Sequence, residues 1–277
     1  MKLISVAVAS LALAAPALAQ QADDPLAKRT ITIAAGAAYL PTYVGSDDYT
    51  VAPAIGARGT IGGYNFQFRG TQGGIDLIRQ PDDPHAIDLQ LGPVAGFNLT
   101  RTRAIKDPQV KALGKLDTAI ELGGYVGIGK TGIITSPYDT LSASVSYVHD
   151  VNGAHGSYRI SPSVTYATPL SRKAYVMISG YTDFIGAKYA DYYYSVTPAG
   201  ALASGLPAYS ARKSGMLDYG VISLVNLSLT GDLTGGLSFI AGGGYSRVLG
   251  RYARSPIVSI AGDRNQWIGG AGLAYTF

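Results

Sequence analysis

The chain has 277 residues, of which 36 are glycine, 20 are tyrosine and none is cysteine, and its formal net charge is +4. Charged residues make up 14% and hydrophobic residues 47% of the chain, which excludes an intrinsically disordered protein, because such chains are rich in charge and poor in apolar residues. The absence of cysteine excludes a disulfide scaffold, thiolate chemistry and a cysteine-ligated zinc site.

The first 19 residues predict a cleaved secretory signal peptide. A short basic start is followed by an apolar run over 3–15 and by the small-residue cleavage signal Ala17-Leu18-Ala19, which is the pattern of a processed leader rather than of a membrane anchor. Residues 20–28 then form a periplasmic segment, and residues 29–277 form the folded part. Because the mature chain is exported, we expect no nucleic-acid partner despite the positive charge.

From residue 29 onward, apolar and polar residues alternate with a period of two. The clearest case is Leu141–Tyr147, in which serine occupies positions 142, 144 and 146. Alternation of this kind gives a strand one apolar and one polar face. Strands of a soluble sandwich average about 5–6 residues, whereas these segments run to ten or more, as transmembrane barrel strands do. The prediction is an all-β protein, a transmembrane antiparallel β-barrel of the outer-membrane type.

The last segment allows a test of length. Trp267, Tyr275 and Phe277 share the apolar face of one strand, and the ten residues from first to last span about 33 Å, or about 25 Å across the membrane at the usual tilt. These three residues are therefore predicted to belong to the aromatic girdles at the two lipid–water interfaces. The terminal Phe277 resembles the C-terminal signal that the barrel assembly machinery reads in bacterial outer-membrane proteins.

Counting the alternating segments predicts about twelve strands, an even number as in single-chain bacterial barrels. With both ends of the barrel in the periplasm, the short turns are periplasmic and the longer connections lie outside the cell. The weakest segment is 73–79, and losing it with a neighbour would leave ten strands. The expected strands are 29–39, 50–60, 63–69, 73–79, 86–98, 115–128, 139–149, 157–168, 173–185, 215–230, 232–248 and 265–277.

Charged residues on the polar faces are expected to point into the lumen, where opposite charges can pair. One interpretation is a structural lattice of ion pairs, and the other is a solute pathway whose selectivity these charges set. Twelve strands lie between barrels filled by side chains and open porins, so at most a narrow conductance is expected, with 186–214 long enough to plug it. The lumen candidates are Arg58, Arg69, Asp88, Asp117, Glu121, Arg159, Asp183 and Asp218.

Positive charge collects in the predicted outer loops. Arg251, Arg254 and Arg264 are the candidates for contact with lipopolysaccharide phosphates, which the planar guanidinium group recognises well. The alternative is that these side chains only keep the loops soluble. Lipid and lipopolysaccharide of the outer membrane are the expected surroundings.

No catalytic residue, cofactor or metal site is predicted. Residues 124–131 match the Walker A spacing, but their glycines lie inside an alternating strand and no helix follows, as nucleotide binding would require. A barrel hydrolase built on His149 and Asp150 is a distant third alternative, because no nucleophile, base and oxyanion donors come together recognisably.

Three separated segments resemble the MipA/OmpV family of outer-membrane proteins. Tyr39–Tyr49 has the form Y-x-P-x-Y-x-G-S-x-x-Y, and 194–209 resembles the family's Y-G-V-T-P…S-G-L-x-x-Y loop, with Ser195 in place of the usual glycine. Ser255–Val258 resembles the last-loop segment S-P-L-V. The likeness runs from about residue 30 to the C-terminus, essentially the whole mature chain.

The resemblance implies an outer-membrane barrel in a Gram-negative cell. One member of the family is a scaffold that joins a lytic transglycosylase to a penicillin-binding protein, and others are linked to porin-like behaviour. A non-enzymatic scaffold for peptidoglycan-remodelling enzymes is thus the first functional expectation, and a narrow porin-like channel for small solutes is the second. The family supplies no site residues to carry over, and the predicted periplasmic turns are short. A partner would therefore need residues 20–28 or the turns near 80–85 and 130–138.

Overall fold

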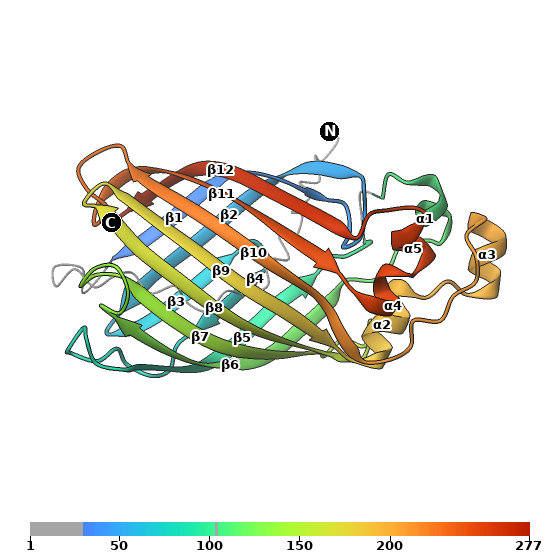
Figure 1. The fold of residues 1–277 in the computed structure, drawn as a ribbon, viewed down its shortest axis with the longest axis horizontal. Coiled ribbons are helices and arrows are strands. Elements are labelled where there is room, and N and C mark those ends of the chain that lie inside the picture. The colour runs from blue at the N-terminus through green and yellow to red at the C-terminus, as the bar shows by residue number, and fades with distance from the viewer. Residues whose placement is uncertain (1–29, 103–104) are drawn as a thin grey trace, which may run out of the picture.

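Twelve antiparallel strands close into a barrel in the computed structural model, which describes residues 30–102 and 105–277. Each strand pairs with its neighbours in sequence, and β1 pairs with β12 to complete the circle (Figure 1). The predicted fold class is confirmed, and the predicted signal peptide and the segment 20–28 lie outside the described residues. The strands are β1 (Ile31–Pro41), β2 (Tyr49–Ile61), β3 (Tyr64–Arg69), β4 (Gln72–Ile75), β5 (Asp88–Asn98), β6 (Ala119–Thr131), β7 (Thr140–Asp150), β8 (Tyr158–Ser171), β9 (Ala174–Ile185), β10 (Gly215–Ser228), β11 (Gly236–Val248) and β12 (Asn265–Thr276).

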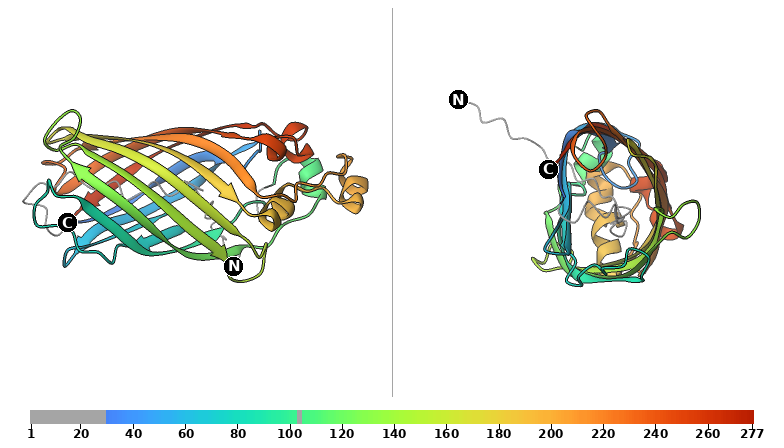
Figure 2. Two further views of the ribbon diagram at one scale, coloured as in Figure 1. Left: turned by 60° about the horizontal axis from the view of Figure 1, so that its bottom comes forward. Right: turned by 90° about the vertical axis from the view of Figure 1, so that its left-hand side faces the viewer.

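All the helices of the described residues lie at one end of the barrel, opposite the C-terminus (Figures 1 and 2). We keep the orientation predicted from the sequence and name the helical end the outer end and the other the periplasmic end. Within the described ranges, no helix is long and apolar enough to cross a membrane. The helices are α1 (Pro108–Ala112), α2 (Ala187–Tyr194), α3 (Pro198–Ser204), α4 (Gly250–Ala253) and α5 (Pro256–Ser259).

The alternation of polar and apolar residues in the sequence places polar side chains inside the barrel and apolar side chains outside it. On β7 the serines at 142, 144 and 146 are buried, whereas Val145 and Tyr147 are 43% and 45% exposed. Hydroxyl groups link neighbouring strands inside: Ser144 Oγ lies 3.1 Å from Ser163 Oγ, and Thr165 Oγ1 lies 2.8 Å from Ser179 Oγ. An apolar exterior around a polar interior is the pattern of a membrane barrel.

Three strands differ from their predicted bounds by four residues at one end. β4 ends at Ile75 rather than at 79, and β11 begins at Gly236 rather than at 232. The segment expected at 115–128 is β6, which begins at Ala119 and ends at Thr131. Residues before it belong to the outer connection, because Leu116 N–H donates to Arg101 O at 3.0 Å and Asp117 N–H donates to the Tyr192 hydroxyl at 2.9 Å. Asp117 is therefore exposed outside the strand, and its prediction as a lumen residue is wrong.

The middle of the seam between β1 and β12, where the barrel closes, consists mostly of glycine and alanine. Gly36 lies opposite Gly272, and Ala37 lies opposite Ala271. A Cβ atom on Gly36 would lie 2.2 Å from Ala271 O. Cβ atoms do not approach other heavy atoms so closely, so this position requires glycine. A hydrogen bond of 2.9 Å between the hydroxyls of Thr32 and Thr276 joins the two strands inside the barrel.

Candidate functional site

Helix α2 lies across the outer mouth of the barrel (right view of Figure 2), and three of its four tyrosines are buried. Tyr189, Tyr193 and Tyr194 are 5%, 2% and 1% exposed. The last carbonyls of the helix have partners, since Arg101 Nη1 donates to Tyr193 O at 3.3 Å and Ser255 Oγ donates to Tyr194 O at 2.6 Å. Burial raises the pKa of the Tyr193 and Tyr194 hydroxyls far above their usual range, so both remain neutral.

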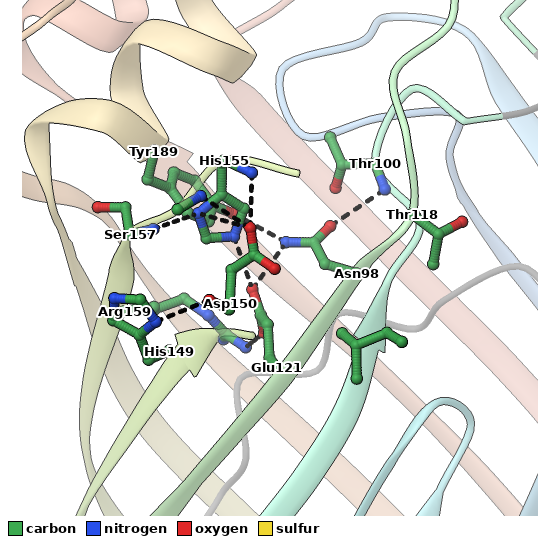
Figure 3. A network of polar contacts seen from close by, with 12 residues as sticks. Asn98, Thr100, Thr118, Glu121, His149, Asp150, His155, Ser157, Arg159 and Tyr189 are labelled. Atoms are coloured by element: carbon green, nitrogen blue, oxygen red, sulfur yellow. Dashed lines mark hydrogen bonds and ion pairs between the residues drawn. The ribbon is translucent and has the colours of Figure 1, made fainter. Parts of the chain in front are cut away.

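Beneath this helix, strand residues form a buried network of charges (Figure 3). Arg159 Nη2 lies 3.1 Å from Glu121 Oε2, and Arg159 Nη1 lies 3.7 Å from Asp183 Oδ2. Asn98 Nδ2 donates to Glu121 Oε1 and lies equally close, 3.2 Å, to the Tyr189 hydroxyl. The network thus connects the barrel wall directly to α2.

The loop 151–157 adds His155 to the network. Its ring packs edge-on against the Tyr189 ring, with 4.9 Å between centroids, and its Nε2 lies 3.6 Å from Glu121 Oε1. The side chain of Asp150 orders the loop by accepting backbone N–H groups of Asn152, Gly153, His155 and Gly156. His155 is 6% exposed although it lies in a connection between two strands.

A hydrolase relay is not assembled around these histidines. His155 Nδ1 accepts the Ser157 N–H at 3.2 Å, so this nitrogen cannot donate a proton to Asp150 as the orienting carboxylate of a catalytic triad requires. His149 Nδ1 lies 2.7 Å from the backbone oxygen of Asp150 rather than from its carboxylate. Within residues 30–102 and 105–277, no group of three or more histidines and carboxylates is placed to hold a metal ion.

The remaining lumen candidates lie on strands. Asp183 and Asp218 are paired in register on β9 and β10, both are buried, and Ser161 Oγ donates to Asp183. Asp88 is buried and accepts a hydrogen bond of 2.7 Å from Gln90 Nε2. Arg58 and Arg69 are half-buried on β2 and β3, and neither forms an ion pair with any described residue.

The candidates for contact with lipid lie on the exterior. Trp267, Tyr275 and Phe277 are 62%, 47% and 67% exposed. At the outer end, Arg254 and Arg264 are exposed and Arg251 is half-buried in α4, where the Tyr209 hydroxyl donates to Arg251 O at 2.7 Å. The side chains of the three arginines are available to an anionic surface, and their binding to lipopolysaccharide stays a prediction.

Sequence reasoning missed the tyrosine cluster of α2 and the partners Asn98 and His155. A signal existed in the sequence, since Tyr189 and Tyr193 are four residues apart and would share one face of a helix. A helix of eight residues gives only a weak periodic signal in a chain in which most segments have a period of two. The contact of His155 with Glu121 joins positions 34 residues apart and needs the closed barrel to bring them together.

Comparison with known proteins decides the family. The family model of the MltA-interacting protein MipA matches residues 33–277. The chain belongs to the MipA family. It is an outer-membrane β-barrel, and no curated protein matches its sequence.

Solved outer-membrane barrels are similar only in outline. An outer-membrane channel from Pseudomonas putida F1 is 12% identical, with a TM-score of 0.46, and the match covers 90% of this chain and 96% of that one. OmpT of Vibrio cholerae is 10% identical over 90% and 97% of the two chains, with a TM-score of 0.37. The toluene transporter TbuX of Ralstonia pickettii is 9% identical over 90% and 89%, with a TM-score of 0.33. Scores this low have no bearing on function.

Proposed function

We propose that this barrel is a non-enzymatic anchor in the outer membrane that holds a lytic transglycosylase at its periplasmic end. The description of the family as an MltA-interacting protein supports the proposal, since the resemblance noted above relates that partner to a lytic transglycosylase. A penicillin-binding protein is the expected third member of such an assembly. The helix across the outer mouth leaves the periplasmic turns as the contact surface.

The observation that carries the proposal is the construction of the turn 132–139. The Asp139 carboxylate accepts the N–H groups of Ile133 at 2.8 Å and Ile134 at 2.9 Å, and also that of Thr135. A turn ordered in this way presents a defined surface, on which Ile133, Ile134 and Tyr138 are 44%, 61% and 55% exposed. Exposed apolar groups on a rigid turn are suited to a protein partner.

The neighbouring turn extends this surface. His85, in the connection between β4 and β5, has its Nδ1 3.5 Å from Thr131 O, so the two turns touch at the periplasmic end. These are the turns near 80–85 and 130–138 that the sequence singled out. β1 begins at the same end of the barrel, so residues 20–28, which precede it in the sequence and follow the proposed leader 1–19, would add a tether.

A pull-down with the purified lytic transglycosylase of the same bacterium tests the proposal. The double variant Ile134→Ser/Tyr138→Ser should lose most of the retained enzyme, because it removes the apolar contacts and leaves Asp139 in place. Leu202→Ser is the matched control, since Leu202 is 90% exposed on α3 at the outer end. Equal retention by all three proteins would contradict the proposal, and deletion of 20–28 measures the tether separately.

A narrow channel is the second candidate, and a space inside the barrel favours it. A cavity of about 240 Å³ is lined by residues of β1, β2, β3, β9, β10, β11 and β12. Solute movement through the barrel would also require α2 to move out of the outer mouth. Recording in planar bilayers distinguishes the candidates, since a steady conductance without binding of the enzyme would favour the channel.

A further inference from the structure

Two lumen arginines have no acidic partner within residues 30–102 and 105–277. Arg58 on β2 lies opposite Gln67 in register, and Arg69 on β3 lies opposite Gly56, so the two cations are diagonal neighbours on the inner wall. The electrostatic neighbours of Arg69 include Arg58, a second cation, and Tyr175. Arg159 is different, because Glu121 and Asp183 neutralise it. Since cations placed side by side repel each other, the pair lacks a counter-charge among the described residues.

Both arginines line the cavity of about 240 Å³. Arg58 reaches across the lumen toward β9, where its guanidinium carbon lies 5.9 Å from the centre of the Tyr175 ring. Asn226 on β10 lines the same cavity and is 4% exposed, and its Oδ1 has no hydrogen-bond partner. Buried amides normally have partners, so this one points to a group that occupies the cavity.

The rest of the lining is small or apolar. Ala34, Gly36, Met177, Leu224 and Ile240 contribute to it. The cavity therefore combines cationic donors on one side with an apolar surface on the other. Its volume is below the range of about 300–1,000 Å³ for pockets that hold drug-sized ligands, so the occupant is small.

Arg58 and Tyr175 lie near the periplasmic end of the barrel. Arg58 is paired with Thr32, the second residue of β1, and Tyr175 is the second residue of β9. Both strands begin at the periplasmic end, whereas α2 and the network of Glu121, Arg159 and Asp183 stand between the cavity and the outer mouth.

We propose that Arg58, Arg69 and Asn226 form a binding site for a small carboxylate with an apolar body, taken up from the periplasm. The planar guanidinium group matches a carboxylate with two parallel hydrogen bonds. Rotation of the Asn226 amide turns its two N–H donors to the same group. The apolar body of the ligand packs against Met177 and Leu224. This site is independent of the proposed contact with a lytic transglycosylase, which uses the turns.

Calorimetric titration of the full barrel in detergent with benzoate tests the site, with benzamide and benzylamine as neutral and cationic probes of the same shape. Benzoate should bind and the other two should not. Arg58→Gln and Arg69→Gln should each weaken benzoate binding about tenfold or more, as expected for loss of a charge-assisted hydrogen bond. Arg79→Gln is the matched control, because Arg79 is an exposed arginine between β4 and β5.

The substitution Asn226→Asp keeps the shape of the side chain and changes its charge. It places a negative charge in the cavity and should abolish benzoate binding. The heat-modifiable mobility of each variant on a gel shows that its barrel has formed. Failure of the wild-type protein to bind benzoate would overturn the site, and so would equal affinity of the wild type and Asn226→Asp. Neither result affects the pull-down, so the two proposals fail separately.

Discussion

Arg159 Nη2 lies 3.1 Å from Glu121 Oε2 inside the barrel, and the two side chains are 9% and 2% exposed. The pair lies directly beneath the helix that crosses the outer mouth. Because Asn98 connects Glu121 to the Tyr189 hydroxyl, the barrel wall and α2 share one set of contacts. The position of α2 at the mouth thus depends on contacts made by this pair.

Removing the charge of Glu121 should destabilise the barrel. Glu121→Gln leaves the buried Arg159 with Asp183 alone, and breaking a buried pair costs about 3–5 kcal/mol. Urea unfolding followed by the fluorescence of Trp267, the one tryptophan of the chain, measures the change. Asp117→Asn removes a carboxylate that is exposed and should have little effect. Similar losses in both variants would contradict a special role for the pair.

Removing α2 should open the lumen. A variant in which a short glycine-serine turn replaces residues 187–213 lacks the buried tyrosines and the contacts of Arg101 and Ser255 with the helix end. Its conductance in planar bilayers should exceed that of the intact protein. A deletion of α3 alone, over Pro198–Ser204, is the control and should leave conductance low. No difference between the two deletions would mean that the narrowing lies elsewhere.

The turn at Asp139 should make stability depend on pH. Burial alone raises the pKa of this carboxyl, but the N–H groups of Thr135, Ile133 and Ile134 outweigh it, so the pKa lies well below its usual range. A lowered pKa in the folded state stabilises the protein above the unfolded value of about 4, and this contribution fades as the pH falls below it. The stability difference between the wild type and Asp139→Ala should therefore be large at neutral pH and smaller at about pH 3. A difference that stays constant with pH would refute the assignment.

The seam should not accept a larger residue. Gly36→Ala forces a Cβ against Ala271 O, and overpacking of this kind costs about 1–3 kcal/mol or more. The folded fraction on a heat-modifiability gel should fall. Gly180→Ala is the matched control, because a Cβ there meets nothing within 4 Å. Equal folding of the two variants would show that the strands can move apart at the seam.

The outer arginines should retain lipopolysaccharide. Replacement of Arg251, Arg254 and Arg264 by glutamine removes three cations from one end and should reduce the lipopolysaccharide that co-purifies with the barrel. Arg172→Gln serves as the control from the periplasmic end, where Arg172 pairs with Asp232 at 3.1 Å. An unchanged yield of lipopolysaccharide from the triple variant would leave these side chains with a solubilising role.

The strands were predictable because their pattern is local. A period of two is present in each segment, and the pairing of successive strands follows from short turns, so even the four-residue β4 was recognised. The candidate site was predictable only in part, since Glu121, Arg159 and Asp183 could be assigned to the lumen but not to one another. Their contacts join strands whose relative stagger no local pattern specifies. The prediction for Asp117 is wrong for a related reason, because the connection that contains it folds back onto Arg101.

The glycine and alanine seam has a consequence for how the cylinder is completed. Its two strands are joined by backbone hydrogen bonds and by the hydroxyls of Thr32 and Thr276, with almost no interlocking of large side chains. The alignment of β1 with β12 therefore depends on the ladder of backbone hydrogen bonds more than on the fit of large side chains. In a membrane, an unpaired backbone group has no water with which to form a hydrogen bond. The backbone hydrogen bonds between β1 and β12 are therefore sufficient to keep the barrel closed.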